Sequence, residues 1–311
     1  MTIVKDIEWH KGMKVTELLK AIGSCGFQGV ELFKAVECIT KMKREGAKIY
    51  LTFTSNMATS GLRGFFAQLI KLKMADVVIT TVGSIEEDIM KAMGEEFHIG
   101  NYSADDVGLH EKGMNRVGNL LIRNESYERF EAYMQEILPK LYEKKKRYSV
   151  SEMLREIGLM LNDEKSILYQ AAKNNVPIFC PAITDGAFGF HLFMFQQDHK
   201  DFIVDVVEDF ANLIFSSSHD EKKGIIALGG GVAKHHAILG TLLNGGADYA
   251  VYMTTAHEYS GSLSGATTRE AKSWGKIKDS ADAVTVIGEV SITFPLAMFT
   301  ALDILSEEGL I

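Results

Sequence analysis

The stretch from Ile225 to Leu239, IIALGGGVAKHHAIL, combines three glycines with two adjacent histidines. Glycines that follow a strand and precede a helix leave backbone amides open to a ligand and let it approach closely. The run matches neither the dinucleotide pattern GxGxxG nor a P-loop. Because neighbouring helical residues point roughly 100° apart, we expect only one of His235 and His236 to face a site. At a helix N-terminus the dipole biases that histidine toward its neutral form, which suits a proton acceptor. The alternative is a histidine that only packs against the fold or caps the helix.

A second candidate for chemistry is the segment REAKSWGKIKDS near the C-terminus. Thr267 and Glu270 have the spacing of a capping box, which predicts that a helix begins there. Lys272 and Lys276 would then be neighbours on one helical face, close to Trp274. A nearby like charge or burial lowers the pKa of a lysine and makes its amine a nucleophile suited to imine chemistry. The alternative is a pair of solvated lysines, with Glu270 acting only as a helix cap.

Short apolar runs alternate with helix-like segments along the chain, and these elements must position the candidate residues. Continuous apolar strands that alternate with helices are typical of an α/β fold, with a parallel sheet covered by helices on both faces. We therefore expect a doubly wound, mainly parallel sheet in a single domain over residues 1–311. The expected strands are 48–54, 77–80, 177–183, 224–228, 247–254 and 283–287, and the expected helices are 60–74, 84–93, 201–215, 235–243, 266–276 and 292–306.

Small, hydroxylic and acidic residues follow each of these expected strands. In an open parallel sheet the carboxyl ends of the strands meet at one edge and form the ligand site. Backbone amides there can bind the phosphates of a dinucleotide, and carboxylates can bind ribose hydroxyls. Ordinary turns favour the same residue types, but their recurrence at every strand end favours a nucleotide. The residues are Ser55, Asn56 and Thr59; Thr81, Gly83, Glu86 and Glu87; Asp185 and Gly186; Gly229, Gly230 and Gly231; Thr255, Gly261, Ser262 and Gly265; and Gly288 and Glu289.

The composition limits the class of protein. The chain has 311 residues, of which 46% are hydrophobic and 24% charged, and its formal net charge is −8. This acidic balance argues against a nucleic-acid partner and suits a cationic substrate. Cys25, Cys38 and Cys180 are widely spaced and indicate neither a disulfide framework nor a metal site. With no signal-peptide core and no apolar run approaching the ~18 residues of a membrane span, we expect a cytoplasmic protein.

Several motifs together resemble the deoxyhypusine synthase family. Their order is kept over nearly the whole chain, and the histidine pair and the SWGK segment together are highly specific. The resemblance, closest in chain length to archaeal or prokaryotic members, implies a Rossmann-like fold, NAD as the cofactor and a homotetramer. The motifs are TSNMATSG at 54–61, VGSIEEDI at 82–89, NRVGNLLIRNESYERFE at 115–131, PAITDGAFG at 181–189, LGGGVAKHH at 228–236, NGGADYAVYMTTAHEYSGSLSGA at 244–266 and SWGKI at 273–277.

The resemblance also implies a reaction. NAD⁺ takes a hydride from spermidine, and the 4-aminobutyl group of the resulting imine passes to Lys276 with release of 1,3-diaminopropane. The group then moves to one lysine of translation factor 5A, where NADH reduces the new imine. His235 matches the acid/base histidine of the family, and Trp274 the tryptophan that packs on the polyamine. The implied substrate-binding residues are Glu86, Glu87, Gly261, Ser262, Glu270 and Trp274, and the implied NAD-binding residues are Ser55, Asn56, Thr59, Thr81, Gly83, Glu87, Asp185, Gly230, Thr255, Ala256 and Glu289.

Three positions depart from the family pattern. Phe190 and Leu263 stand where eukaryotic members carry acids that anchor the polyamine, and Glu289 replaces an aspartate. The donor therefore stays open between spermidine, agmatine and another amine. A homospermidine synthase-like aminobutyltransferase with a small-amine acceptor is the alternative enzyme. A regulatory relative without donor binding is a third interpretation, against which the retained lysine, histidine and tryptophan argue.

Overall fold

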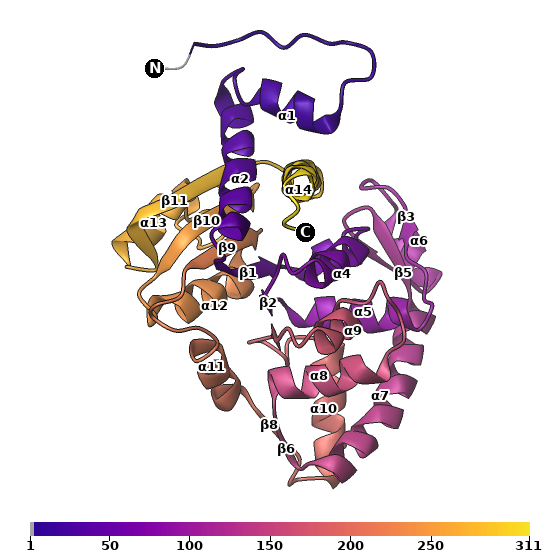
Figure 1. Cartoon of the computed structure of the whole chain (residues 1–311). Coiled ribbons are helices and arrows are strands. Elements are labelled where there is room, and N and C mark those ends of the chain that lie inside the picture. The colour runs from indigo at the N-terminus through magenta and orange to yellow at the C-terminus, as the bar shows by residue number, and fades with distance from the viewer. Residues whose placement is uncertain (1–2) are drawn as a thin grey trace. The chain divides into compact units, whose positions relative to one another are not determined.

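The computed structural model describes residues 3–311, whose contacts divide the chain into two compact units. Unit 1 holds the described residues up to Phe53, together with Leu72–Ile79 and Leu213–Ile311. Unit 2 holds Thr54–Lys71 and Thr80–Asn212. The chain passes between the units several times, as the colour gradient in Figure 1 lets the reader follow. The single domain expected over residues 1–311 stays a prediction.

Unit 1 is built on a parallel sheet. Its strands lie in the order β11-β10-β9-β1-β2, and every neighbouring pair is parallel. Tyr50, for example, lies opposite Val77 on one side and Ile225 on the other. Every residue of β9 is buried, as expected for strands covered on both faces. The strands are β1 (Lys48–Phe53), β2 (Val77–Ile79), β9 (Lys223–Leu228), β10 (Ala247–Thr254) and β11 (Ile277–Ile287).

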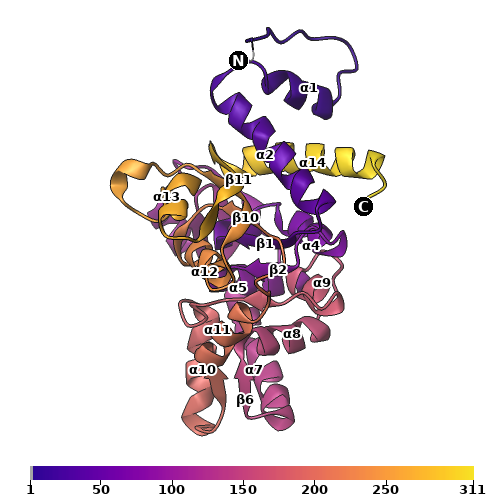
Figure 2. The same ribbon diagram turned by 60° about the vertical axis from the view of Figure 1, so that its left-hand side comes forward.

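Helices cover both faces of this sheet. The long helices α2 and α14 pack on one face and α12 packs on the other, which the two views show consistently (Figures 1 and 2). The predicted parallel α/β architecture with helices on both faces is therefore confirmed. The helices of unit 1 are α1 (Val15–Ile22), α2 (Phe27–Arg44), α12 (Gly231–Leu242), the 3-10 helix η1 (Glu258–Ser260), α13 (Thr268–Ser273) and α14 (Val290–Glu307).

Helix α14 is long and apolar enough to cross a membrane by length and composition alone, whereas the sequence analysis expects no such segment. In the fold, however, Phe294, Ala297, Met298 and Ala301 are fully buried. The helix packs against α2 and β10. The core of unit 1 therefore accounts for the buried apolar residues of α14, whereas Ile292 and Phe299 on the same helix are more than half exposed.

Unit 2 is mostly helical. The antiparallel strands β3, β5 and β4 form one small sheet, and β6 pairs in parallel with β8. The sequence analysis expects neither of these small sheets. The helices are α3 (Ser55–Thr59), α4 (Arg63–Lys71), α5 (Val82–Ala92), α6 (Asp106–Glu111), α7 (Asn124–Lys144), α8 (Val150–Met160), α9 (Ile167–Lys173), α10 (Ala187–Asp198) and α11 (Val206–Ile214), and the strands are β3 (His98–Ile99), β4 (Met114–Val117), β5 (Leu120–Arg123), β6 (Arg147–Ser149), β7 (Ile178–Phe179) and β8 (Ile203–Asp205).

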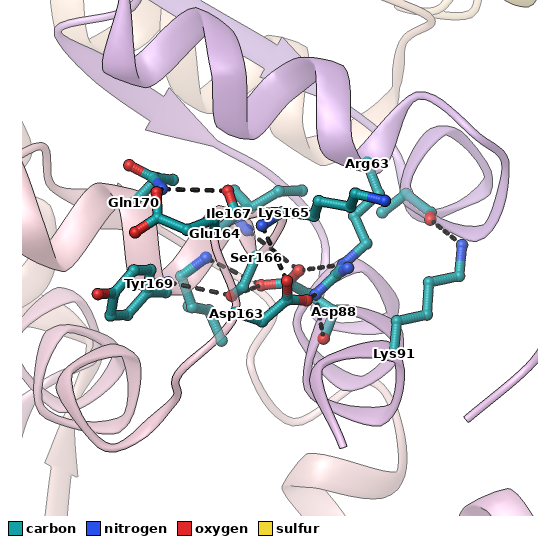
Figure 3. Close-up of polar contacts among 12 residues, drawn as sticks. Arg63, Asp88, Lys91, Asp163, Glu164, Lys165, Ser166, Ile167, Tyr169 and Gln170 are labelled. Carbon is teal, nitrogen blue, oxygen red and sulfur yellow. Dashed lines mark hydrogen bonds and ion pairs between the residues drawn. The ribbon is translucent and has the colours of Figure 1, made fainter. Parts of the chain in front are cut away.

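A buried ion network holds α4, α5 and α9 together in unit 2 (Figure 3). Asp88 is 1% exposed, and its carboxylate accepts hydrogen bonds from Nε of Arg63 at 2.5 Å and from the hydroxyl of Ser166 at 2.8 Å. The same carboxylate accepts the backbone N–H groups of residues 167 and 168, at the start of α9. Arg63 also pairs with Asp163 at 2.7 Å. The charge of Asp88 is therefore neutralised and its oxygens are satisfied, as a buried carboxylate requires.

Candidate functional site

Lys276 lies in a tight turn between α13 and β11. The helix begins as predicted, because the hydroxyl of Thr267 accepts the N–H of Glu270 at 3.4 Å. It ends at Ser273, since Gly275 has a φ of 67°, a left-handed conformation that terminates helices. The predicted continuation of the helix to residue 276 is therefore wrong. Lys272 and Lys276 do not share a helical face, and Nζ of Lys272 instead donates to the carbonyl of residue 279 at 2.8 Å.

The backbone of Lys276 is fixed while its amine faces an aromatic ring. The Lys276 carbonyl accepts the N–H of Ala247 at 3.1 Å and the hydroxyl of Thr241 at 3.3 Å. Nζ of Lys276 lies 5.0 Å from the ring centroid of Trp274, within the range of a cation–π contact. Lys276 is 8% exposed and Trp274 is 66% exposed. The tryptophan therefore shields the amine and presents the rest of its surface to solvent.

A pocket within unit 1 gathers the candidate residues of the SWGK segment. Lys276, Trp274 and Glu270 all line it, so three residues that the sequence analysis singles out lie together. It is a small pocket with both polar and apolar lining residues. The remaining lining residues are Lys234 and Ile238 from α12, Tyr252 from β10, Leu263, Ala266 and Thr267 from the segment before α13, and Ala271 from α13 itself.

The two histidines lie in the second turn of α12. Burial and the nearby charge of Lys276 lower the pKa of His235. Burial and the charge of His235 lower the pKa of His236 to about 4. Both imidazoles are therefore biased toward the neutral form, which is the form that accepts a proton. His235 does not line the pocket of Lys276.

The glycine corner is shaped by a neighbouring loop as well as by its own backbone. Gly229 and Gly231 have φ angles of 81° and 69°, which favour glycine. A Cβ on Gly230 would lie 2.3 Å from the Cα of Ser264, so only glycine fits there. The N–H of Gly231 donates to the hydroxyl of Ser264 at 3.1 Å. Packing of this loop is therefore a reason for the glycines that the sequence could not reveal, in addition to ligand approach.

The other predicted site residues of unit 1 lie at exposed strand ends. Thr255 and the half-buried Ala256 follow β10, and the N–H of Ala256 donates to the hydroxyl of Thr254 at 3.0 Å. Gly261 and Ser262 are exposed after η1. Glu289 is the exposed N-cap residue of α14 and accepts a hydrogen bond from the hydroxyl of Ser291, close to its own helix terminus.

In unit 2, the starts of α3 and α5 lie against each other and bring a second set of predicted residues together. The hydroxyl of Thr81 accepts the N–H of Ser55 at 2.9 Å and does not cap its own helix, α5. A Cβ on Gly83 would lie 2.8 Å from the Cβ of Ser55, so glycine permits this close approach. The hydroxyl of Thr59 donates to the buried carboxylate of Glu87. Asn56 is exposed on the same short helix, α3.

Glu86 has a structural task that the sequence analysis does not foresee. Its buried carboxylate accepts the N–H of Phe188 at 2.8 Å and so caps the start of α10. Gly186 is needed beside it, because a Cβ there would lie 2.4 Å from Oε1 of Glu86. Burial raises the pKa of Glu86. Asp185 and Phe190 lie exposed near the same turn, and a substrate-binding role for Glu86 stays a prediction.

Two lysines that the sequence analysis misses, the half-buried Lys91 and the buried Lys234, hold these two sets of residues in place. Nζ of Lys91 donates to three consecutive carbonyls, those of residues 58, 59 and 60, at 2.6–3.1 Å. Nζ of Lys234 donates to the carbonyls of Leu263 and Ala266 at 3.0 and 2.6 Å. Burial lowers the pKa of each lysine to about 8. The sequence contains a signal for Lys91, because it lies four residues after Glu87 on a predicted helix. It contains none for Lys234, which appears only as an isolated lysine in an apolar helix.

Glu87→Gln is expected to stabilise the protein at pH 8 and to leave its stability nearly unchanged at pH 5. Burial raises the pKa of Glu87 from 4.5 to about 7, against smaller opposing effects of Thr59 and Lys91. The folded state therefore binds this proton more tightly than the unfolded state does, and stability falls as pH rises from about 4.5 to 7. The uncharged amide removes this loss, on the order of 1–3 kcal/mol.

Urea denaturation at pH 5 and pH 8 measures this difference, with the exposed Glu143→Gln as the matched control. An equal change in the free energy of unfolding at both pH values would contradict the raised pKa of Glu87.

The chain is similar to known proteins over nearly its whole length. The family model "DS: Deoxyhypusine synthase" matches residues 17–301. A Thermoplasma acidophilum protein named as a probable deoxyhypusine synthase is 39% identical over 300 residues, covering 95% of this chain and 96% of the relative. The deoxyhypusine synthase of Kluyveromyces lactis is 36% identical and covers 95% and 90% of the two chains. A solved structure from Entamoeba histolytica, assigned to the same enzyme, has a TM-score of 0.71 at 30% identity and covers 97% of each chain. The chain belongs to the deoxyhypusine synthase family.

Proposed function

We propose that this chain catalyses the NAD-dependent transfer of the 4-aminobutyl group of spermidine, through an imine on Lys276, to one lysine of translation factor 5A. Membership of the family supplies the reaction. The observation that supports it in this chain is the pocket that the buried residue Lys276 lines together with Trp274 and Glu270. A dehydrogenase that only moves a hydride has no use for such an amine, whereas a group transfer through an imine requires one.

The side chains of the pocket suit the steps of this transfer. Bound NAD would supply the hydride acceptor that oxidises the donor amine. The Lys276 nitrogen then forms a bond to the oxidised carbon, the bond from that carbon to the diaminopropane nitrogen breaks, and the protons lost by the lysine pass to the leaving amine. His235, biased toward its neutral form, would accept and return one of these protons. The Trp274 face and the Glu270 carboxylate would hold the donor's ammonium groups, which are costly to desolvate without partners.

The residues proposed to bind NAD offer suitable groups in each unit. Within residues 3–311, the N-cap residues of α5 and α12 form no side-chain hydrogen bond with their own helices. Apart from the N–H of Gly231, which donates to Ser264, backbone N–H groups at these helix starts would therefore bind phosphate oxygens. The carboxylate of Glu87 would accept from a ribose hydroxyl. The proposed contacts are Ser55, Asn56, Thr59, Thr81, Gly83, Glu87 and Asp185 in unit 2, and Gly230, Thr255, Ala256 and Glu289 in unit 1.

The substrate side of the proposal has both buried and exposed members. Glu270 and Trp274 line the Lys276 pocket, while Gly261 and Ser262 lie on the exposed loop before it. Glu86 and Glu87 add buried carboxylates in unit 2. We also propose that the protein is a cytoplasmic homotetramer. Light scattering measures the molar mass of the assembly in solution.

Mass spectrometry tests the function directly. We expect that the purified protein, incubated with NAD, labelled spermidine and the factor 5A precursor, adds one 4-aminobutyl group to a single lysine and releases 1,3-diaminopropane. Agmatine is tested as a donor in parallel, because Phe190 is exposed where eukaryotic members carry an acid. A small polyamine product with unmodified factor would instead identify the homospermidine synthase-like alternative.

A further inference from the structure

Lys91 lies in the last turn of α5, and its side chain reaches the end of the neighbouring short helix α3. Its Nζ donates to the carbonyls of Ala58, Thr59 and Ser60 at 2.8, 2.6 and 3.1 Å. An ammonium group has three protons, so these three acceptors use all of them. The same nitrogen lies 4.7 Å from the ring centroid of Phe97, in the range of a cation–π contact. The amine of Lys91 is therefore committed to the protein itself.

Helix α3 is too short to hold its own position. It spans five residues, Ser55–Thr59, and an isolated helix shorter than about 12 residues is marginal in water. The last carbonyls of a helix lack partners within it, and a positive charge at that end is favourable. Lys91 supplies both the charge and the donors. The charged groups that act on its amine are Glu87 and Asp88 on α5 and Arg63 on α4, but burial is the main reason that its pKa falls to about 8.

Helix α3 carries three of the residues proposed to bind NAD, namely Ser55, Asn56 and Thr59. The hydroxyl of Thr59 donates to the carboxylate of Glu87, a further proposed contact, which lies one turn before Lys91 on α5. Because Glu87 and Lys91 are four residues apart, they share one face of α5. Loss of the Lys91 hydrogen bonds would therefore displace these proposed NAD contacts together.

We propose that the ammonium group of Lys91 positions α3 for NAD and thereby sets the affinity for the cofactor without contacting it. The inference rests on the proposed function, because that function supplies NAD as the ligand of α3. Lys91 acts through the main chain of α3 and is therefore a positioning residue. It takes no part in the transfer to Lys276, so its loss should weaken NAD binding and leave the later steps unchanged at saturating NAD.

Lys91→Met keeps an unbranched side chain of similar length and removes all three donors. We expect calorimetry to show a rise of about 10- to 100-fold in the Kd for NAD, since hydrogen bonds from a charged group are lost. At saturating NAD, the rate of aminobutyl transfer should stay within about twofold of wild type. The matched control is Lys140→Met, because Lys140 is exposed on α7 and pairs with Glu136 at the same four-residue spacing. It should change neither value.

The pH dependence of NAD binding is a readout that a purely structural role would not change. In the wild type, the Kd for NAD should rise about threefold or more between pH 8 and pH 9.5, as Lys91 loses one proton and its charge. Glu87 stays ionised over that range, because its pKa is about 7. Lys91→Gln, which carries a neutral amide with two of the donors, should lack this dependence.

A wild-type Kd for NAD in folded Lys91→Met would overturn the positioning role while leaving the proposed function intact. So would a wild-type Kd that does not change between pH 8 and pH 9.5, or a wild-type pH dependence in Lys91→Gln, the variant that decides if Lys91→Met does not fold. Equal losses of NAD binding and of transfer at saturating NAD would also overturn it, because they would indicate a general disturbance of unit 2. Absence of NAD binding by the wild-type protein would overturn the proposed function and this inference together.

Discussion

Lys276→Ala is expected to lower the rate of aminobutyl transfer to factor 5A by about 10³-fold or more, while NAD binds with unchanged affinity. Lys276 is a buried residue whose amine lies 5.0 Å from the ring centroid of Trp274, in the pocket assigned to the donor. The other lysine of that pocket, Lys234, cannot replace it, because its Nζ is committed to two backbone carbonyls. Mass spectrometry of the factor measures transfer, and calorimetry measures NAD binding.

Two further variants sharpen this test. Lys276→Arg keeps a positive charge but should be as inactive as the alanine variant, because a guanidinium is not deprotonated in proteins and forms no imine. Lys272→Ala should retain activity, since its amine donates to the carbonyls of residues 279 and 281. Normal modification of the factor by Lys276→Ala would show that the nucleophile is another group.

Asp88→Ala is expected to lower the free energy of unfolding by about 3–5 kcal/mol, the cost of leaving a buried charge without its partner. Arg63 is 6% exposed and would keep only Asp163 as an ionic partner. The hydroxyl of Ser166 and two N–H groups at the start of α9 would also lose their acceptor (Figure 3).

Urea denaturation measures the effect of this substitution. Asp163→Ala is the control, because its side chain is 23% exposed and water can replace it beside the guanidinium. We expect its effect to be about 1 kcal/mol or less. An Asp88→Ala protein that unfolds at the wild-type urea concentration would contradict the role given to this network.

Strands β1, β2, β9 and β10 were predictable because each is a mainly apolar run between turn residues. Strand β11 begins at Ile277, earlier than the predicted residue 283, because polar residues from Lys278 to Asp282 hide its first half. Strand β10 has the predicted bounds, Ala247–Thr254. Helix α10 was missed for the opposite reason, since it has no amphipathic period. Phe190, Phe193 and Met194 are each at least half exposed, while Phe188 and Leu192 are buried. A helix with large apolar side chains on all sides gives no periodic signal from which to locate it.

The site residues that lie close together in the sequence were predictable. Those that only tertiary packing brings together were not. Lys276, Trp274 and Glu270 are close in sequence and belong to one motif, so the sequence was sufficient to group them. Tyr252 reads as one more apolar strand residue, and nothing local shows that its hydroxyl lacks a partner. Lys234 becomes informative only once its two carbonyl acceptors, about 30 residues further along the chain, are known. Contacts of this kind depend on the packing of the segment before α13 onto α12.

The clamped main chain of Lys276 limits how far a covalently attached group can travel. Its carbonyl is held by Ala247 and Thr241, so the peptide on which the lysine sits cannot swing outward. A group bound to the Lys276 nitrogen therefore moves only by rotation about the bonds of that one side chain. Delivery to another protein then requires the recipient to reach inward with a narrow projecting tip, past the indole at the rim.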